Sequence, residues 1–569
     1  MNSESGPASA SYAFGTPLAA EPGIGALTLG GYLRQVTERF GAREAAVLRE
    51  DDAVERWTYA QLWERSFEVA RALIACGVVG GTRVGVLMTN RIEFLSAFFG
   101  TALAGGVATT ISTFFTASEL DEVLQASGCS VLLFERKVLK KDFAEMLVGL
   151  EPAVAAAAPG GLASLRYPFL RHLVSVGEAG GPGAIESWPA FLARGRGVDP
   201  ARVDATAQAI KPSDPGALFF SSGSTGKAKG ILSAHRGVCL QLWRWAQWYG
   251  LVEPPRTWSS NGFFFSGNFC QALGGVLTSG GALILQRWFD ADVALQLMER
   301  ERATMALAWP HQWAQLEAAP GYAATDLSAM RYVDATTPLA QHPTVSTDWR
   351  EPAHAFGCTE TFTLISVFPG NTPDDIAGRS HGAPTAGSTI KIVDPISGKV
   401  MPLGERGEIA VKGPTLMLGY IGIPLDETLD DEGFYRTGDG GWIDGQGRLF
   451  WEGRLNDIIK TGGANVSPLE IDNVIRALPG VKICQTVGVP DPLLGELVVS
   501  CIVPHEGYAL DEGQVKEAAK VKLASFKVPR RVLFFDEARI QTTGSAKIKT
   551  SDLRKLAQDI LGNGRAGAE

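Results

Sequence analysis

Short apolar runs alternate with amphipathic stretches from the start of the chain to about Gly387. The runs have the length and composition of buried strands, whereas the stretches between them place apolar residues three and four positions apart, as helices do. Alternation of this kind is typical of α/β layers with largely parallel sheets. The pattern predicts strands at Val84–Met88, Val131–Phe134, His172–Val176, Leu218–Phe220, Ala282–Leu285 and Met305–Ala308, and helices at Tyr59–Cys76, Ala291–Arg302 and Gln312–Ala319.

Past Gly387 the pattern changes to short strands with Gly and Pro turns, which predicts a small β-subdomain. From Asn456 a helix, two strands and a second helix predict an α+β unit the size of a small domain. A chain of 569 residues is too long for one core. The expected fold is therefore α/β, with a disordered or loosely packed tail at 1–24, a large N-terminal domain of layered α/β sheets at 25–454 and a small C-terminal domain at 455–569. The expected elements are strands at Thr389–Val393, Lys399–Met401, Gly407–Lys412, Cys484–Val489 and Val498–Pro504, and helices at Pro468–Ala477 and Asp511–Leu523.

One stretch, Phe94–Ser118, carries no charged residue and is long enough to span a bilayer. Glycines and hydroxyl side chains interrupt it, so we interpret it as a buried helix at about Ile92–Ala104 followed by a strand near Val107–Ile111. The first residues, Met1–Ser11, lack the basic region and apolar core of a secretory signal. We therefore expect no membrane span.

Composition and charge narrow the class of protein further. Hydrophobic residues make up 45% and charged residues 20% of the chain, as in globular proteins. A net charge of −9 gives no reason to expect nucleic acid as a partner. The seven cysteines form no CxxC pair and have no metal-ligand spacing, which favours free thiols in a reducing cytoplasm. We expect a cytoplasmic monomer or homodimer.

The segment Phe219–Gly230 reads FFSSGSTGKAKG and follows directly on a predicted strand. Glycines let the backbone approach a polyphosphate, hydroxyl and amide groups donate to its oxygens, and lysines neutralise its charge. The spacing does not fit a Walker A loop. A flexible surface loop of ordinary turn composition would read similarly, so this segment alone leaves both interpretations open.

Further motifs follow in order: Phe356-Gly-Cys-Thr-Glu360, Tyr435-Arg-Thr-Gly-Asp439, Gly453-Arg454, Lys460-Thr-Gly-Gly-Ala-Asn-Val-Ser-Pro468 and Thr543-Gly-Ser-Ala-Lys-Ile548. Together with the glycine-rich segment, they resemble the adenylate-forming superfamily, which includes acyl-CoA synthetases and the adenylation domains of peptide synthetases. The resemblance extends over nearly the whole chain.

This resemblance implies an enzyme that works in two steps. A carboxylate attacks the α-phosphorus of ATP, pyrophosphate leaves, and an acyl-adenylate forms. The thiol of CoA then attacks the adenylate and releases AMP. The implied ligands are a small-molecule carboxylic acid, ATP, Mg²⁺ and CoA, with an acyl-carrier protein as another possible acceptor.

Three residues take the places of the family's catalytic groups. Lys547 corresponds to the lysine that bridges the carboxylate and the α-phosphate, although Ala546 stands where relatives have glycine. Glu360 is the implied magnesium ligand, because a carboxylate suits a hard cation that also holds phosphate oxygens. Thr359 is expected to donate to a phosphate oxygen.

Other residues are implied to bind the nucleotide. Phe356 replaces the usual Tyr that stacks on adenine, and it can stack without the hydroxyl. Asp439 is expected to accept from the ribose hydroxyls and Arg454 to contact ribose or phosphate, while a salt bridge that caps turns is the structural alternative for both. The implied nucleotide-binding set is Ser221, Ser222, Gly223, Ser224, Thr225, Gly226, Lys227, Lys229, Thr336, Phe356, Gly357, Cys358, Asp439 and Arg454.

The motif at Lys460–Pro468 resembles the version found in acyl-CoA and aryl-CoA synthetases. Gly462 and Gly463 would leave room for a pantetheine arm, and Asn456 stands where the family has its hinge, usually Asp or Lys. The resemblance thus implies a mobile α+β C-terminal domain. A turn that needs glycine for its backbone conformation is the structural alternative for the two glycines.

The implied acid pocket contains no charged residue, which favours an apolar acid over an amino acid. The aromatic cluster that follows the glycine-rich segment, Trp243, Trp245, Trp248 and Tyr249, has spacing that suits core packing better than a ligand site. The implied pocket residues are Phe265, Ser266, Gly267, Phe269, Trp309 and Phe362.

The leading hypothesis is an AMP-forming acyl-CoA synthetase. The nearest alternative is an acyl-AMP ligase that loads the phosphopantetheine of a carrier protein. A third hypothesis, from a different class, is a nucleotide-binding scaffold without catalysis, for which Ala228, Asn456 and Ala546 are the supporting departures from the family pattern.

Overall fold

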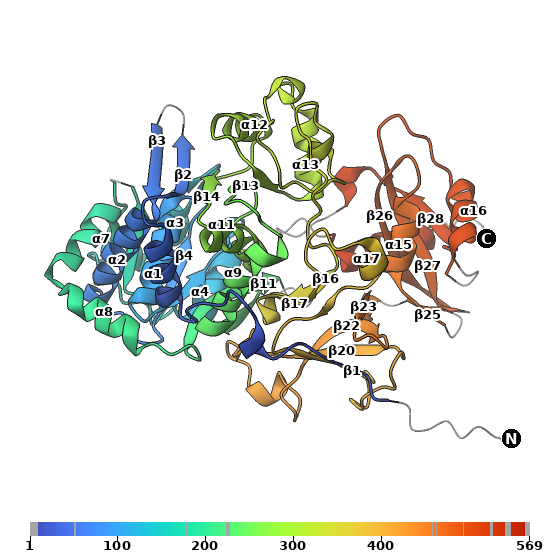
Figure 1. Ribbon diagram of the computed structural model, residues 1–569, viewed down its shortest axis with the longest axis horizontal. Helices are drawn as coiled ribbons and strands as arrows, with labels where there is room; N and C mark the ends of the chain where they lie inside the picture. The colour runs from blue at the N-terminus through green and yellow to red at the C-terminus, as the bar shows by residue number, and fades with distance from the viewer. Residues whose placement is uncertain are drawn as a thin grey trace. The chain divides into compact units, whose positions relative to one another are not determined.

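The computed structural model describes residues 9–50, 53–177, 179–222, 228–457, 459–461, 464–492, 494–523, 527–540 and 548–563 (Figure 1). The chain divides into two compact units. The larger unit contains Phe14–Thr389 and Val411–Tyr435, and the smaller contains Met1–Ala13, Ile390–Ala410 and Arg436–Glu569. The division predicted at 454/455 stays a prediction.

An eight-stranded sheet forms the centre of the larger unit. Neighbouring strands from β10 to β11 pair in parallel, whereas β12 joins β11 as an antiparallel hairpin and β21 adds antiparallel to β12. The strands predicted in this region are therefore confirmed. The strand order is β10 (Ile185–Ser187), β9 (His172–Val176), β6 (Val131–Glu135), β4 (Arg83–Leu87), β5 (Val107–Thr110), β11 (Pro215–Ser222), β12 (Ala228–Ala234) and β21 (Gly419–Tyr420).

A second sheet of five strands belongs to the same unit. Its strands pair in parallel except for the antiparallel pair of β2 and β3. The predicted strands near residues 282 and 305 are confirmed, while β2, β3 and β13 were not predicted. The order is β15 (Met305–Leu307), β13 (Arg256–Ser259), β14 (Ala282–Leu285), β2 (Glu44–Glu50) and β3 (Ala53–Thr58).

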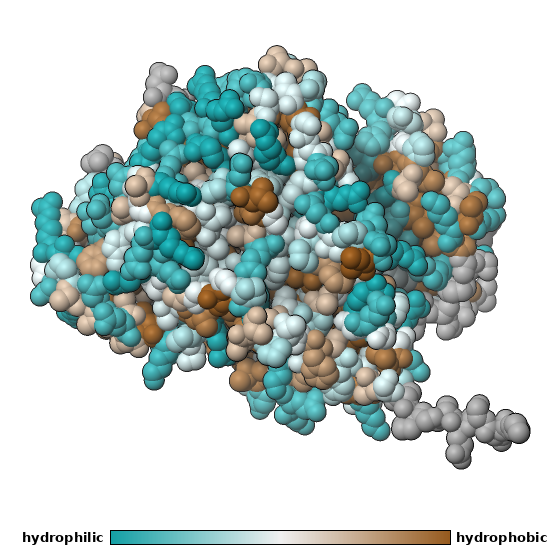
Figure 2. Space-filling model, viewed as in Figure 1, coloured by the Kyte–Doolittle hydropathy of each residue, from teal (hydrophilic) through white to brown (hydrophobic). Residues whose placement is uncertain are grey.

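The uncharged stretch near residue 94 folds as predicted. Helix α3 (Ile92–Leu103) is buried at every position except Glu93, and β5 follows it. Helix α2 (Tyr59–Ala75), which begins with a capping box of Thr58 and Gln61, packs against α3. No helix in the described part of the chain is long and apolar enough to cross a membrane. On the face drawn in Figure 2, hydrophobic residues are scattered among hydrophilic ones.

Helices of the larger unit cover its sheets (Figure 1). The predicted helices at 291–302 and 312–319 are confirmed as α12 (Ala291–Arg300) and α13 (Pro310–Ala318). The aromatic cluster on α9 (His235–Trp248) is buried, which confirms its role in the core. The remaining elements are α1 (Leu29–Phe40), α4 (Ala117–Ser127), α5 (Phe143–Leu150), α6 (Ala153–Ala156), α7 (Trp188–Arg194), α8 (Pro200–Ala209), α10 (Ser266–Phe269), α11 (Gly275–Ser279), α14 (Asp374–Ala377), β7 (Lys137–Val138), β8 (Lys141–Asp142), and the sheet of β16 (Ala355–Cys358), β17 (Thr363–Val367) and β18 (Ala383–Pro384).

The smaller unit contains two further sheets, which match the predicted β-subdomain and α+β region. The strand predicted at Lys399–Met401 is wrong: after the turn at 394–398 the backbone pairs with the end of β19 through an isolated bridge of Val400 with Val393, too short for a strand. The elements are β1 (Tyr12–Phe14), β19 (Thr389–Val393), β20 (Gly407–Lys412), β22 (Tyr435–Ile443) and β23 (Leu449–Arg454) in one sheet, and β25 (Ala464–Val466), β24 (Ile459–Thr461), β27 (Gly495–Pro504), β26 (Val481–Asp491) and β28 (Arg531–Phe534) in the other, with α15 (Pro468–Arg476), α16 (Glu512–Lys522) and α17 (Thr550–Asn563).

All seven cysteines are free thiols, as the sequence predicted. Five of them, including Cys239 and Cys270, are fully buried. Burial raises the pKa of the Cys239 and Cys270 thiols well above its usual value, because a thiolate would be desolvated there. These cysteines therefore act as small apolar side chains in the core.

Candidate active site

The loop that carries Glu360 joins β16 to β17 through a single turn, Thr359–Thr361. The two residues that follow have positive φ, 51° at Phe362 and 110° at Thr363. A β-branched residue at such an angle is a strained outlier, and strain of this kind concentrates at functional sites. The loop also requires glycine at position 357, because a Cβ atom there would lie 1.8 Å from the carbonyl oxygen of Thr363.

Two side chains, one within the loop and one on α9, hold this strained loop in place. The Thr361 hydroxyl accepts from the amide of Cys358 at 3.1 Å and donates to the carbonyl of Thr363 at 2.7 Å. The buried amide group of Gln241, on α9, donates to the carbonyls of Thr361 and Leu364 at 3.2 and 2.8 Å. These bonds compensate the cost of the strained backbone.

The Glu360 side chain is half-buried and contacts two tyrosines. Tyr420 Oη donates to Glu360 Oε1 at 2.6 Å, and Tyr435 Oη lies 2.9 Å from Tyr420 Oη. Burial, followed by the nearby charge of Glu360, raises the pKa of both phenols well above their usual range. Both tyrosines are therefore neutral hydrogen-bonding groups beside the carboxylate at any ordinary pH.

The other predicted residues of this motif lie on the same hairpin. Phe356 is buried, whereas Gly357 is exposed and Cys358 and Thr359 are half-buried. Burial and the charge of Glu360 raise the pKa of the Cys358 thiol far above its usual range, which excludes a reactive thiolate. Thr336 is exposed, and its hydroxyl donates to Asp334 Oδ1 at 2.5 Å.

The predicted phosphate loop connects β11 to β12, and the residues that flank it pair in the register Ser221 to Lys229 and Ser222 to Ala228. The backbone of Ser222 is described, but Gly223, Ser224, Thr225, Gly226 and Lys227 lie outside the described residues. Lys229 Nζ lies 5.1 Å from the centre of the Tyr420 ring, within cation–π range. The end of the phosphate loop thus contacts the tyrosine that binds Glu360.

The predicted acid-pocket residues fall into two aromatic groups. Phe269 and Phe362 are buried and both pack against Phe219, with ring centres 5.7 and 5.2 Å away. Phe265 and Trp309 are half-buried, with their ring centres 5.7 Å apart. Ser266, which begins α10, is buried, and Gly267 is half-buried beside it.

In the smaller unit, Asp439 and Arg454 are cross-strand partners on β22 and β23. Arg454 Nε lies 3.2 Å from Asp439 Oδ1, the Trp451 indole donates to the same oxygen at 3.1 Å, and Arg454 Nη1 donates to the carbonyl of Thr437 at 2.8 Å. The salt bridge considered from the sequence is therefore present. Asp439 is buried and Arg454 is exposed, so the pair presents its guanidinium to solvent.

Three further predicted residues lie outside the part of the chain that the structure describes: Lys547, Gly462 and Gly463. For Asn456 the structure describes the backbone, which lies in a turn at Leu455–Asp457. Conversely, Tyr420, Gln241 and Thr361 surround the Glu360 loop without having been predicted. Tyr420 and Gln241 are far from Glu360 in sequence, so no local motif marks them.

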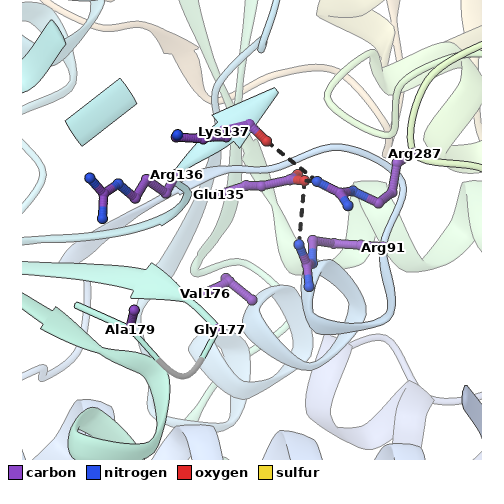
Figure 3. A pocket seen from close by; sticks show the side chains of 8 residues that line it. All are labelled: Arg91, Glu135, Arg136, Lys137, Val176, Gly177, Ala179 and Arg287. Atoms are coloured by element: carbon purple, nitrogen blue, oxygen red, sulfur yellow. Dashed lines mark hydrogen bonds and ion pairs between the residues drawn. The ribbon is translucent and has the colours of Figure 1, made fainter. Parts of the chain in front are cut away.

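A separate hollow of about 430 Å³ lies at the carboxyl ends of β6 and β9 (Figure 3). Glu135, at the end of β6, forms ion pairs with Arg91, whose Nη1 lies 3.3 Å away, and with Arg287. Arg287 follows β14 and also pairs with Glu50 at the end of β2. The guanidinium groups of Arg91 and Arg287 are thus already paired with carboxylates. We interpret these ion pairs as a structural link between the two sheets and the hollow beside them as no ligand site.

Three features that the resemblance to adenylate-forming enzymes implies lie in the larger unit: the Glu360 carboxylate on a strained loop, the hairpin of β11 and β12, and two groups of packed aromatic side chains. Comparison with known proteins agrees. The chain matches the family described as AMP-binding enzyme over residues 33–421 and the AMP-binding enzyme C-terminal domain over residues 470–547. The chain belongs to this family, and it is an AMP-forming acid–thiol ligase of the acyl-CoA synthetase type.

Individual relatives cover nearly the whole chain. A feruloyl-CoA synthase from Amycolatopsis is 31% identical over 508 residues, covering 88% of this chain and 93% of the relative. A 3-[(3aS,4S,7aS)-7a-methyl-1,5-dioxo-octahydro-1H-inden-4-yl]propanoyl:CoA ligase from Mycobacterium tuberculosis is 31% identical over 527 residues, covering 90% and 95%. Among solved structures, a fatty acyl CoA synthetase from Mycobacterium tuberculosis aligns with a TM-score of 0.64 at 25% identity, covering 94% of this chain and 99% of that one.

Proposed function

We propose that this ligase activates an apolar carboxylic acid with Mg·ATP and transfers the acyl group to CoA. The observation that carries the choice of acid is the pair of aromatic groups at the predicted pocket, Phe269 with Phe362 and Phe265 with Trp309. None of the six predicted pocket residues carries a charge that could hold an ammonium group. Aromatic walls favour apolar acyl chains or rings by burying their surface.

The first half-reaction places negative charge on the α-phosphate as pyrophosphate leaves. We propose Lys547 as the cation at that centre and Thr359 as a donor to a phosphate oxygen. Serine, threonine and lysine side chains of the loop from Ser221 to Lys229 would bind the β- and γ-phosphates. The adenine would stack on Phe356, and Asp439 and Arg454 would contact the ribose.

The donor set around Glu360 fits magnesium rather than a transition metal. Glu360 offers a single carboxylate, and the described residues contain no cluster of three His, Cys, Asp or Glu side chains that could hold a metal by themselves. Magnesium is commonly bound by one or two carboxylates together with substrate phosphates. When bound, it would neutralise phosphate charge.

The second half-reaction requires a thiol to reach the adenylate carbonyl. We propose that Gly462 and Gly463 leave space for the pantetheine arm and that the segment 455–569 moves about Asn456 between the two steps. The seven free thiols support a reducing compartment, the cytoplasm, as the location. Free CoA is the proposed acceptor, because the full-length relatives named above are CoA ligases.

The test measures AMP release with Mg·ATP over a panel of aliphatic, aryl and polycyclic acids, with and without CoA. Acid-dependent AMP together with acyl-CoA is the expected result. An adenylate that free CoA does not discharge, but a holo-carrier protein does, would replace the acceptor in this proposal. A strong preference for α-amino acids would contradict the apolar pocket.

A further inference from the structure

The hydroxyl of Tyr420 hydrogen-bonds directly to Glu360, and the donor of each bond in this group follows from the number of protons available. Tyr420 Oη donates to Glu360 Oε1 at 2.6 Å, and Tyr435 Oη lies 2.9 Å from Tyr420 Oη. A phenol has one proton to donate, and an ionised carboxylate only accepts. Since Tyr420 gives its proton to Glu360, Tyr435 must donate to Tyr420. The hydrogen bonds therefore run from Tyr435 through Tyr420 to Glu360.

The same tyrosine contacts the strand that follows the phosphate loop. Strand β21 pairs antiparallel with β12, with Tyr420 opposite Ile231. This register places Lys229 Nζ 5.1 Å from the Tyr420 ring centre. A cation over an aromatic face is attracted by the ring quadrupole. Tyr420 therefore connects the predicted phosphate-binding and metal-binding parts of the site, with its ring on one and its hydroxyl on the other.

The backbone of Glu360 is fixed, but its side chain has several rotatable bonds. The amide of Met417 donates to the Glu360 carbonyl at 2.7 Å, and the strained residues Phe362 and Thr363 follow directly. A hydrogen bond to an ionised carboxylate is short and about twice as strong as a neutral one, so it selects one side-chain orientation.

We propose that Tyr420 is a positioning residue that orients the Glu360 carboxylate for the divalent cation that accompanies ATP. This inference rests on the metal role of Glu360 in the proposed function. Tyr420 contributes no atom to the reaction and acts only through Glu360. Tyr435 supports it by fixing the direction of the Tyr420 hydroxyl.

The test is a binding measurement, so it does not depend on turnover. Titration calorimetry gives two dissociation constants of the protein, one for ATP with EDTA and one for Mg·ATP. The first divided by the second is the factor by which the metal tightens ATP binding, and this factor is the ratio compared below. Tyr420→Phe keeps the ring and removes the hydroxyl, and it should lower the ratio about tenfold. Tyr322→Phe is the matched control, because it also removes one hydroxyl bond, to the Pro338 carbonyl at 3.0 Å, in the same unit.

A double-mutant comparison separates positioning from a general structural role. With Glu360→Gln already in place, adding Tyr420→Phe should change the ratio no further, because the carboxylate that Tyr420 orients is gone. Tyr435→Phe leaves the bond from Tyr420 to Glu360 in place, and it should lower the ratio by about two- to threefold. Circular dichroism checks that each variant is folded.

The outcomes are distinct. A wild-type ratio near one would contradict the metal role of Glu360 and this inference with it. A large wild-type ratio that Tyr420→Phe leaves unchanged would overturn this inference alone and leave the proposed function standing. If Tyr420→Phe does not fold, Tyr435→Phe decides, and an unchanged ratio in that variant overturns the inference.

Discussion

Two carboxylates that the sequence predicts to be functional, Glu360 in the larger unit and Asp439 in the smaller, are held in different ways. Glu360 lies on a turn followed by two strained residues; Tyr420 of β21 contacts its side chain, and Gln241 of α9 binds the backbone of the same loop. Asp439 lies on an antiparallel pair of strands whose positive-φ positions, Gly438 and Gly453, are glycines, and its partner Arg454 is its cross-strand neighbour. Positive φ thus falls on non-glycine residues directly after Glu360, where it costs strain, whereas glycines adopt it beside Asp439 without that cost.

The largest expected difference is between the substitutions Glu360→Gln and Asp439→Asn. Glu360→Gln should lower acid-dependent ATP–pyrophosphate exchange by about 10²–10³-fold, because it removes the charge that we propose holds the metal. Asp439→Asn should raise the KM for ATP by about tenfold with a smaller change in kcat, because it weakens a ground-state contact. Steady-state kinetics of ATP–pyrophosphate exchange gives kcat and the KM for ATP of both variants. An equal loss of kcat in the two variants would contradict the comparison.

Alanine at two glycines tests the difference in backbone strain. Gly357→Ala should cost about 3 kcal/mol or more, because its Cβ would meet the Thr363 carbonyl oxygen at 1.8 Å. Gly438→Ala should cost only about 1 kcal/mol, because φ is +72° but the nearest atom is Arg454 Nη1 at 3.6 Å. Denaturant unfolding of each variant gives the two values. A Gly357→Ala variant as stable as wild type would refute the close packing of this loop.

Burial of His235 makes the larger unit sensitive to acid. Desolvation lowers the pKa of His235 to about 4, from 6.5, so the native state stays neutral while the unfolded chain binds a proton. The free energy of unfolding should therefore fall as pH drops from about 6.5 to about 4, by about 3 kcal/mol in total. Hydrogen exchange along α9 measures this loss. Constant protection of α9 across that window would show that His235 is not held neutral.

The smaller unit contains a group with the opposite dependence. Burial raises the pKa of Asp472 to about 6, from 3.8, so the native state keeps a proton that the unfolded chain releases. Stability from this group should fall as pH rises from about 4 to about 6, by about 3 kcal/mol. Hydrogen exchange along α15 follows this change. Asp472→Asn should flatten the dependence of stability on pH between about 4 and about 6. An unchanged dependence in that variant would assign it to another group.

The smallest expected effect concerns the acid pocket. Phe265→Leu should raise the KM for an apolar acid by about three- to tenfold and leave the KM for ATP unchanged, because it removes part of the contact with Trp309. Val252→Ala, at an exposed position of the same unit, is a control for non-specific effects. A change in the KM for ATP as large as that for the acid would argue against a pocket role.

The sequence predicts those parts of the molecule that local patterns determine. Buried strands such as β4 and β6, and the turn that carries Glu360, can be read from runs and motifs. Tyr420 could not be found in this way, because only the pairing of β21 with β12 brings it to Glu360. The salt bridge of Asp439 with Arg454 stayed an alternative until the register of β22 and β23 was known. Contacts set by long-range register are the part that a single sequence leaves open.

Acid-dependent ATP–pyrophosphate exchange is the most direct test of the central claim that this chain forms an acyl-adenylate. With Mg·ATP, labelled pyrophosphate and an apolar acid, label should enter ATP only when the acid is present, and Glu360→Gln should remove nearly all of the signal. Exchange that does not depend on an acid, or ATP binding without exchange over the full panel of acids, would contradict the account.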